Sequence, residues 1–349
     1  MRKFTNNKWN LFLLATALMT SSCHQEDALP GAPGAGDEGE TQAVTIKINF
    51  PFEETGSSLR SIGGAEENAI QTVDVLAFRV DGEKAYFDYS VAGEKISDDA
   101  ISAVLWTRSY PQRLVLITNA RAQIEQLLRP ESLPSGWRGV EQEAMLAGLE
   151  FSLTEGAKWQ AINAANYTAF PMWGESEAVT ITKRTPQGAY SIRLIRMVAK
   201  INVQLDKSVS GLTGKFKIKN VRLYNTYTKG RIAPGEVENG KVTQATVPDG
   251  AERYLGPLEY DDFSVPGEPD VAVRGSIYTF ETPAAVRASE ATCLVIGGIY
   301  MNDTKETYYR IDFLDEDGEY ASILRNHQYT VNINNVTGSG YDTPEEAFE

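Results

Sequence analysis

The chain has 349 residues, with 33 lysines and arginines against 47 aspartates and glutamates, and a formal net charge of −14. This length is enough for two domains of about 150 residues each. The acidic balance excludes nucleic acid and anionic lipid surfaces as natural partners, since both repel a negative protein surface.

The N-terminus has the features of a bacterial lipoprotein signal. Arg2, Lys3 and Lys8 give a positive start, and an apolar run from Trp9 to Met19 follows. This run is shorter than the roughly 20 apolar residues of a membrane-spanning helix, so it indicates a removable export signal. Small residues then lead into Cys23. Acylation of Cys23 would hold the protein at a membrane surface by its lipid.

Residues 1–22 are therefore predicted to be a signal peptide. Their removal takes away three basic residues and leaves a net charge of −17. The alternative is an ordinary secretory signal in which the cysteine is coincidental. Residues 23–42 are rich in Gly, Pro, Ala and acidic residues, a composition that predicts a flexible tether.

The first expected strand follows the tether. One face of the segment AVTIKINFPF carries an apolar residue at every second position, as a half-buried strand does. These residues are Val44, Ile46, Ile48 and Phe50. Glu53 to Glu67 is polar and predicts a loop, and Ile70 to Val80 predicts a second strand that ends at the Asp81-Gly82 turn.

The rest of the chain predicts more strands and little helix. Arg113 to Asn119 is typical of a central strand, Ala122 to Leu128 has helical spacing, and Leu149 to Thr154 predicts a strand. Pro171 to Glu175 predicts a loop, whereas Tyr190 to Leu205 fits either strands or a partial helix. Later strands are expected at Phe216–Tyr224, Ser276–Thr282, Thr292–Tyr300, Thr307–Phe313 and Gln328–Val336.

Short strands separated by turns favour antiparallel β-sandwiches over α/β units. The turn-forming residues Pro186, Gln187 and Gly188 mark the best candidate boundary. We therefore expect an all-β chain with short helices in its loops. Its N-terminal β-sandwich would span residues 43–188 and its C-terminal β-sandwich residues 189–349.

No group of residues typical of an enzyme is evident, and we expect neither catalysis nor a cofactor or metal. HExxH, CxxC and GxSxG do not occur in the sequence. His327 is expected to have a structural role, and Cys293 to be a small buried side chain. The acidic stretch DFLDEDGE lacks the full spacing of a calcium loop. Four tryptophans either stack on sugars or pack internally as most tryptophans do: Trp106, Trp137, Trp159 and Trp173.

Six stretches along the chain carry a further signal: ENAIQTVDVLAFRVDGE, RLVLITNA, FPMWGE, IRMVAKINV, VRLYNTYTKGRIAP and LRNHQYTVNINNVTGSGYDTPEEA. Together they resemble the fimbrillin family of Bacteroidetes, the type V pilins, with PMWGE and RNHQYTVNI as the most specific parts. The resemblance covers most of residues 43–347. It implies two transthyretin-like β-sandwiches in tandem, exported as an outer-membrane lipoprotein and then built into an extracellular fimbrium.

The resemblance also implies a mechanism of assembly. In such pilins a trypsin-like protease cuts after an arginine and frees the first strand, so that a strand of the next subunit can enter. Here Arg60, followed by Ser61, is the only basic residue between Lys47 and Arg79, in a stretch of the kind that proteases prefer. Cleavage would release the segment from Cys23 to Arg60, which carries the lipid and the first strand and loop (residues 43–60). Its loss would leave an apolar gap for a donated strand. The alternative is that Arg60 is an ordinary solvated arginine.

The last residues bear on the position within a fimbrium. The segment TGSGYDTPEEAFE alternates little and would be a poor donor strand. We therefore expect a subunit that accepts a strand from other pilin subunits, in a tip or accessory position, and that contributes to adhesion to a host or bacterial target. Two alternatives stay open: an anchor subunit that keeps its lipid and first strand, and a surface lipoprotein that binds a glycan or other ligand without polymerising.

Overall fold

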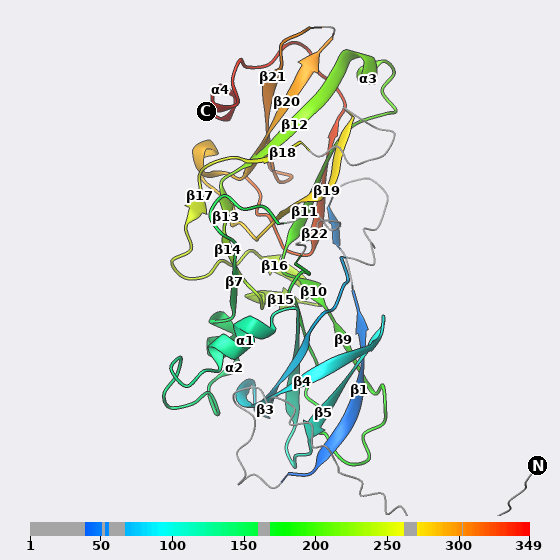
Figure 1. Ribbon diagram of the computed structural model, residues 1–349, viewed down its shortest axis with the longest axis vertical. Coiled ribbons are helices and arrows are strands. Elements are labelled where there is room, and N and C mark those ends of the chain that lie inside the picture. Colours follow the sequence, from blue (N-terminus) through cyan, green and yellow to red (C-terminus); the bar gives the residue numbers. More distant parts are fainter. Residues whose placement is uncertain (1–38, 51–52, 56–66, 160–167, 262–270, 302) are drawn as a thin grey trace, which may run out of the picture.

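The computed structural model describes residues 39–50, 53–55, 67–159, 168–261, 271–301 and 303–349. Strands form most of the regular structure of these residues, and the helices are few and short. The all-β fold class predicted from the sequence is therefore confirmed. The molecule is elongated, with most strands of the first half of the chain at one end and those of the second half at the other (Figure 1).

The largest sheet has eight strands in the order β10-β8-β6-β3-β4-β5-β1-β9. Neighbouring strands are antiparallel, except that β1 and β9 are parallel. The strands are β1 (Thr41–Asn49), β3 (Val73–Asp81), β4 (Lys84–Ser97), β5 (Ala100–Trp106), β6 (Gln112–Thr118), β8 (Met172–Glu175), β9 (Tyr190–Arg193) and β10 (Ile195–Arg196).

The two edges of this sheet meet. Only Leu194 separates β9 from β10 in the chain, yet these strands lie at opposite ends of the strand order, so the sheet curls on itself. Gly174 of β8 lies directly against the backbone carbonyl of Arg193 in β9, where a side chain would clash. The curled sheet encloses an inner core that includes Val44, Ile46, Val75, Ile101, Leu116 and Ile192.

An outer core covers the other face of the same sheet. Adjacent residues of β3 therefore point into different cores, Val75 into the inner and Leu76 into the outer one. Helices α1 (Arg121–Leu127) and α2 (Gln142–Ala147) contribute Ile124 and Met145 to the outer core. Aromatic side chains from both halves of the chain join it: Trp159, Phe170, Tyr278 and Phe280.

Two four-stranded sheets form a sandwich in the second half of the molecule. Their orders are β19-β11-β22-β2 and β18-β12-β20-β21. They share one core, in which Ile201 of β11 and Val273 of β19 cluster with Val221 of β12 and Leu294 of β20. The strands are β2 (Glu53–Thr55), β11 (Ala199–Leu205), β12 (Phe216–Tyr224), β18 (Leu258–Tyr260), β19 (Ala272–Thr279), β20 (Cys293–Tyr300), β21 (Thr307–Asp312) and β22 (His327–Ile333).

Smaller elements connect these parts. The pair formed by β7 and β14 joins the two halves of the chain. Within the second half, Arg325 bonds the buried Glu281 carboxylate at 2.7 Å and the Ile232 carbonyl at 2.7 Å. The remaining elements are β7 (Glu150–Ser152), β13 (Thr226–Tyr227), β14 (Lys229–Arg231), β15 (Glu236–Glu238), β16 (Lys241–Gln244), β17 (Arg253–Tyr254), α3 (Leu212–Lys215), η1 (Ala288–Glu290) and α4 (Pro344–Phe348).

The structure corrects two predicted loops. Pro171 to Glu175 contains strand β8, whose Met172 and Trp173 enter the inner and outer cores. The predicted loop from Glu53 to Glu67 contains β2. The ambiguous segment from Tyr190 to Leu205 forms β9, β10 and β11, and the helix expected before Pro130 is present as α1. The division of the chain at residue 188 stays a prediction.

Candidate functional site

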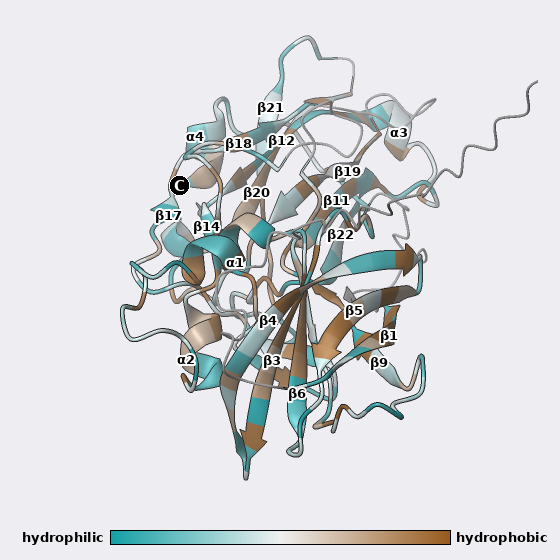
Figure 2. Ribbon diagram, turned by 60° about the horizontal axis from the view of Figure 1, so that its bottom comes forward, coloured by the Kyte–Doolittle hydropathy of each residue, from teal (hydrophilic) through white to brown (hydrophobic). Residues whose placement is uncertain are grey.

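Strand β1 occupies an internal position of the curled sheet, between β5 and β9; we call this position the β1 slot. Residues Thr41–Lys47 lie antiparallel to Trp106–Ala100, and Ile46–Asn49 lie parallel to Tyr190–Arg193. The three strands lie side by side in two views of the molecule (Figures 1 and 2). One backbone edge of β1 is therefore paired with β5, and the other is paired with β9 over Ile46–Asn49.

One face of β1 is buried. Val44, Ile46 and Ile48 are 1 %, 0 % and 4 % exposed, and all three belong to the inner core. Phe50, just after the strand, packs against the same core from a partly buried position. The half-buried strand expected from the alternation is therefore present, whereas its displacement stays a prediction.

Withdrawal of β1 would open the inner core to water. Burial of an aliphatic side chain of this size stabilises a fold by about 1.5–3 kcal/mol, so the three buried residues together contribute roughly 6 kcal/mol. The backbone edges of β5 and β9 would also lose their partner. An empty β1 slot is thus an apolar groove between two open strand edges, which is the arrangement that an added strand satisfies.

The same segment also reaches the other half of the molecule. Strand β2 lies parallel to β22, with Glu53–Thr55 opposite His327–Tyr329. Residues 41–55 therefore supply one strand to the curled sheet and one to the edge of a sandwich sheet.

The chain is anchored again at Glu67. The buried Glu67 carboxylate accepts a hydrogen bond from the Lys200 ammonium at 2.7 Å and another from the Tyr278 hydroxyl. Arg196 donates to the Glu67 backbone carbonyl at 3.2 Å. Burial lowers the pKa of the Lys200 ammonium, and the negative charge of Glu67 opposes that shift. Glu67 is therefore held by residues of the second half of the chain.

Three predicted site residues lie outside the described residues: Cys23, Arg60 and Ser61. The nearest described residues around the expected cut are Thr55, at the end of β2, and Glu67. A cut between residues 60 and 61 would leave β1 and β2 attached to the rest of the protein only by non-covalent contacts. The connectivity thus makes this segment separable by a single cleavage.

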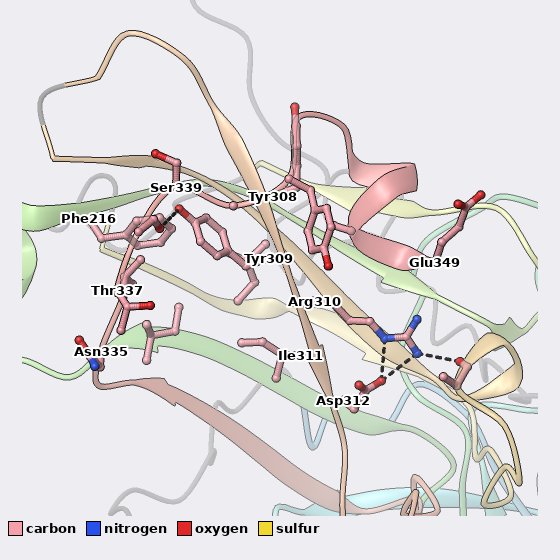
Figure 3. A pocket seen from close by; sticks show the side chains of 18 residues that line it. Phe216, Tyr308, Tyr309, Arg310, Ile311, Asp312, Asn335, Thr337, Ser339 and Glu349 are labelled. Carbon is pink, nitrogen blue, oxygen red and sulfur yellow. Dashed lines mark hydrogen bonds and ion pairs between the residues drawn. The ribbon is translucent and has the colours of Figure 1, made fainter.

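A second feature is a groove of about 740 Å³ between β21 and the chain after β22, which we call the C-terminal groove (Figure 3). At one end of it Arg310 binds the Asp312 carboxylate at 2.9 Å and the Ala288 carbonyl at 2.7 Å. Sequence analysis did not identify Arg310 and Asp312 as site residues, because the alternation of side chains in β21 is the same as in any strand that borders a core. The apolar wall consists of Phe216, Ile296, Tyr309, Ile311, Ile333 and Val336.

The C-terminal tail borders this groove. Tyr341 pairs with Tyr308 of β21 through two backbone hydrogen bonds of 2.9 and 3.0 Å. Helix α4 then begins with a capping box at Thr343. Phe348 stacks on Tyr224 with ring centroids 4.5 Å apart. The tail is therefore folded onto its own sheet and does not form an extended free strand.

Among the side chains that the sequence offered as possible catalytic or ligand-binding groups, His327, Cys293, Trp159 and Trp173 are buried within the fold. The buried His327 places its Nδ1 2.8 Å from the Arg325 carbonyl oxygen, and burial raises the pKa of the Cys293 thiol to about 12. Trp159 and Trp173 are buried in the outer core. Within the described ranges, no three His, Cys, Asp or Glu side chains gather closely enough to hold a metal ion. No helix in these ranges is both long enough and apolar enough to cross a membrane.

Comparison with known proteins identifies the family. The family model described as "Fimbrillin-A associated anchor proteins Mfa1 and Mfa2" matches residues 38–344. The major fimbrium tip subunit FimE of Porphyromonas gingivalis is 22 % identical over 343 residues, which cover 97 % of this chain and 54 % of FimE. The chain thus spans about half the length of this relative.

One solved structure with the same fold is a tip fimbrial protein. The tip fimbrial protein Mfa3 of Porphyromonas gingivalis, with a C-terminal truncation, superposes with a TM-score of 0.50 at 13 % identity, covering 86 % of this chain and 96 % of that one. A fimbrial assembly protein of Parabacteroides distasonis has a TM-score of 0.46 at 13 % identity, with coverages of 83 % and 91 %. Because the family model matches most of its residues, the protein belongs to the family of fimbrillin-A associated anchor proteins Mfa1 and Mfa2.

Proposed function

We propose that this protein is a fimbrial subunit of the cell surface that exchanges β1 for a strand of another pilin subunit. The observation that carries the proposal is the placement of β1. It fills an internal slot with three buried apolar side chains, yet after a single cut at the predicted site only non-covalent contacts would hold it. A donated strand with the same alternation would restore both the backbone pairing and the inner core. Membership of the fimbrillin family supports this role.

The proposal extends to processing and position. Cys23 would carry the lipid that holds the precursor at the outer membrane, and an arginine-specific protease would cut after Arg60. The subunit would then stand at a tip or accessory position of the fimbrium and contact a host or bacterial surface. The name of FimE as a tip subunit supports such a position.

A second candidate is an anchor subunit, which the name of the matching family favours. An anchor would keep its lipid on Cys23 and would retain β1. The two candidate functions share the fold and differ in whether the chain is cut after Arg60. The presence or absence of this cut therefore distinguishes them.

The experiment that tests exchange uses the full chain and a fluorescent peptide with the sequence of residues 40–50. After treatment with an arginine-specific protease, we expect one cut after Arg60 and slow entry of the peptide into the β1 slot. The matched control, Arg60→Gln, should stay uncut and exclude the peptide. A chain that is cut after Arg60 but never exchanges its first strand would contradict the proposal.

A further inference from the structure

We propose that Gln187 is a clasp that holds the strand in the β1 slot by binding its backbone. The inference rests on the proposed function, because the clasp would have to bind the strand of another subunit after that strand replaces β1. Strand β9 begins at Tyr190, opposite Ile46. The earlier residues of β1 therefore extend beyond β9 on this side of the sheet, and Gln187 lies beside them.

The side-chain amide of Gln187 takes the place of a peptide group in the ladder. Its Oε1 accepts a hydrogen bond from the Thr45 amide at 2.9 Å, and its Nε2 donates to the Ala43 carbonyl at 2.9 Å. The next contact is made by the main chain, where the Gly188 amide donates to the Thr45 carbonyl at 2.9 Å. A carboxamide has one acceptor oxygen and a donor NH₂, as a peptide unit has C=O and N–H, so it can continue the pairing.

A tight turn holds Gln187 in this position. The Ala189 amide donates to the Pro186 carbonyl at 3.3 Å, and Gly188 has a left-handed φ of +67°. A Cβ on Gly188 would also lie 3.3 Å from Cε of Lys47. The turn formed by Pro186, Gln187 and Gly188 thus presents the Gln187 side chain to β1.

These contacts describe the partner that the slot accepts: an extended strand of another subunit, parallel to β9. Its apolar residues would take the places of Val44, Ile46 and Ile48, and a shift by one residue would turn them away from the inner core. The residue in the place of Thr45 needs a backbone N–H, which excludes proline. A hydroxyl there adds a contact, since Thr45 Oγ1 donates to Gln187 Oε1 at 2.6 Å.

The first test measures peptide binding to the cut protein. The probes are the peptide of residues 40–50 and the same peptide with an N-methyl group on Thr45. Loss of about one or two hydrogen bonds should weaken binding of the methylated peptide roughly tenfold. Gln187→Ala should weaken binding of the unmodified peptide by a similar factor and should abolish the difference between the two peptides. The clasp would be overturned if N-methylation weakened peptide binding by the same factor for the unaltered protein and for Gln187→Ala.

The second test needs no cleavage. In the intact chain, Gln187→Ala should accelerate hydrogen exchange of the Thr45 amide by roughly tenfold. The Ile48 amide, which donates to the Asp99 carbonyl at 2.8 Å on the β5 side, should keep its rate and serves as internal control. The matched variant Arg184→Ala, an exposed residue of the same loop, should alter neither rate. Unchanged exchange at Thr45 would overturn the clasp, whereas accelerated exchange without any peptide binding would support it and contradict strand exchange.

Discussion

The substitution Ile46→Ala probes how strongly the buried face holds β1 in its slot. Ile46 is 0 % exposed and lies between Val44 and Ile48 on that face. Alanine removes three carbon atoms from the inner core and leaves a cavity. Large-to-small substitutions of this kind cost about 2–5 kcal/mol of unfolding free energy. The neighbouring Lys47→Ala is the control, because Lys47 is exposed and its loss should cost less than about 0.5 kcal/mol.

Urea unfolding followed by tryptophan fluorescence measures both variants. Trp106 is a suitable reporter, since it packs against the inner core and pairs with Thr41 at the start of β1. Hydrogen exchange across β1 gives a second readout and should be faster in Ile46→Ala than in Lys47→Ala. Equal stabilities and equal exchange rates for the two variants would refute the view that the apolar face of β1 holds it in the slot.

Three further predictions concern the rest of the fold. Glu67→Gln leaves the buried Lys200 ammonium without its carboxylate and should cost about 3–5 kcal/mol in denaturant unfolding, a loss that the double change with Lys200→Met should partly restore. Burial raises the pKa of Asp74 from 3.8 to about 6, so its protonated form is favoured by folding and its stabilising effect is present below pH 4 and lost as the pH rises through about 6. Asp74→Asn should therefore remove the fall in unfolding free energy between about pH 4 and pH 6. If the variant and the unaltered protein had the same dependence of unfolding free energy on pH, Asp74 would not be its cause. Phe348→Ala removes the stack on Tyr224 and should make the C-terminal tail a target in limited proteolysis, while the proteolytic pattern elsewhere stays as in the unaltered protein.

Whether a strand could be predicted from the sequence depended on how many of its faces are buried. The alternation of Val44, Ile46 and Ile48 predicted β1 because its other face meets solvent. Strand β8 escaped prediction because Met172 and Trp173 enter cores on opposite faces, so no polar residue marks a period of two. Strand β2 has no apolar residue at all, and it forms because the edge of β22 pairs with it.

The contacts around the β1 slot could not be predicted from local patterns. Gln187 lies 142 residues from Thr45 in the chain, and the sequence presented it only as part of a turn. Lys200 lies 133 residues from Glu67, and an isolated glutamate in a polar stretch gives no sign of a buried ion pair. Such pairs depend on which segments, distant in the chain, lie side by side, and the periodicity within one strand does not encode that. The resemblance to fimbrillins indicated a removable first strand, and the structure adds what surrounds it.

The most direct test of strand exchange is the N-terminal sequence and intact mass of the protein isolated from its native cell surface. A chain that begins at Ser61 and carries no lipid is the result we predict for an accepting fimbrial subunit. A chain that still begins at an acylated Cys23 and retains β1 would contradict exchange and would favour an anchor.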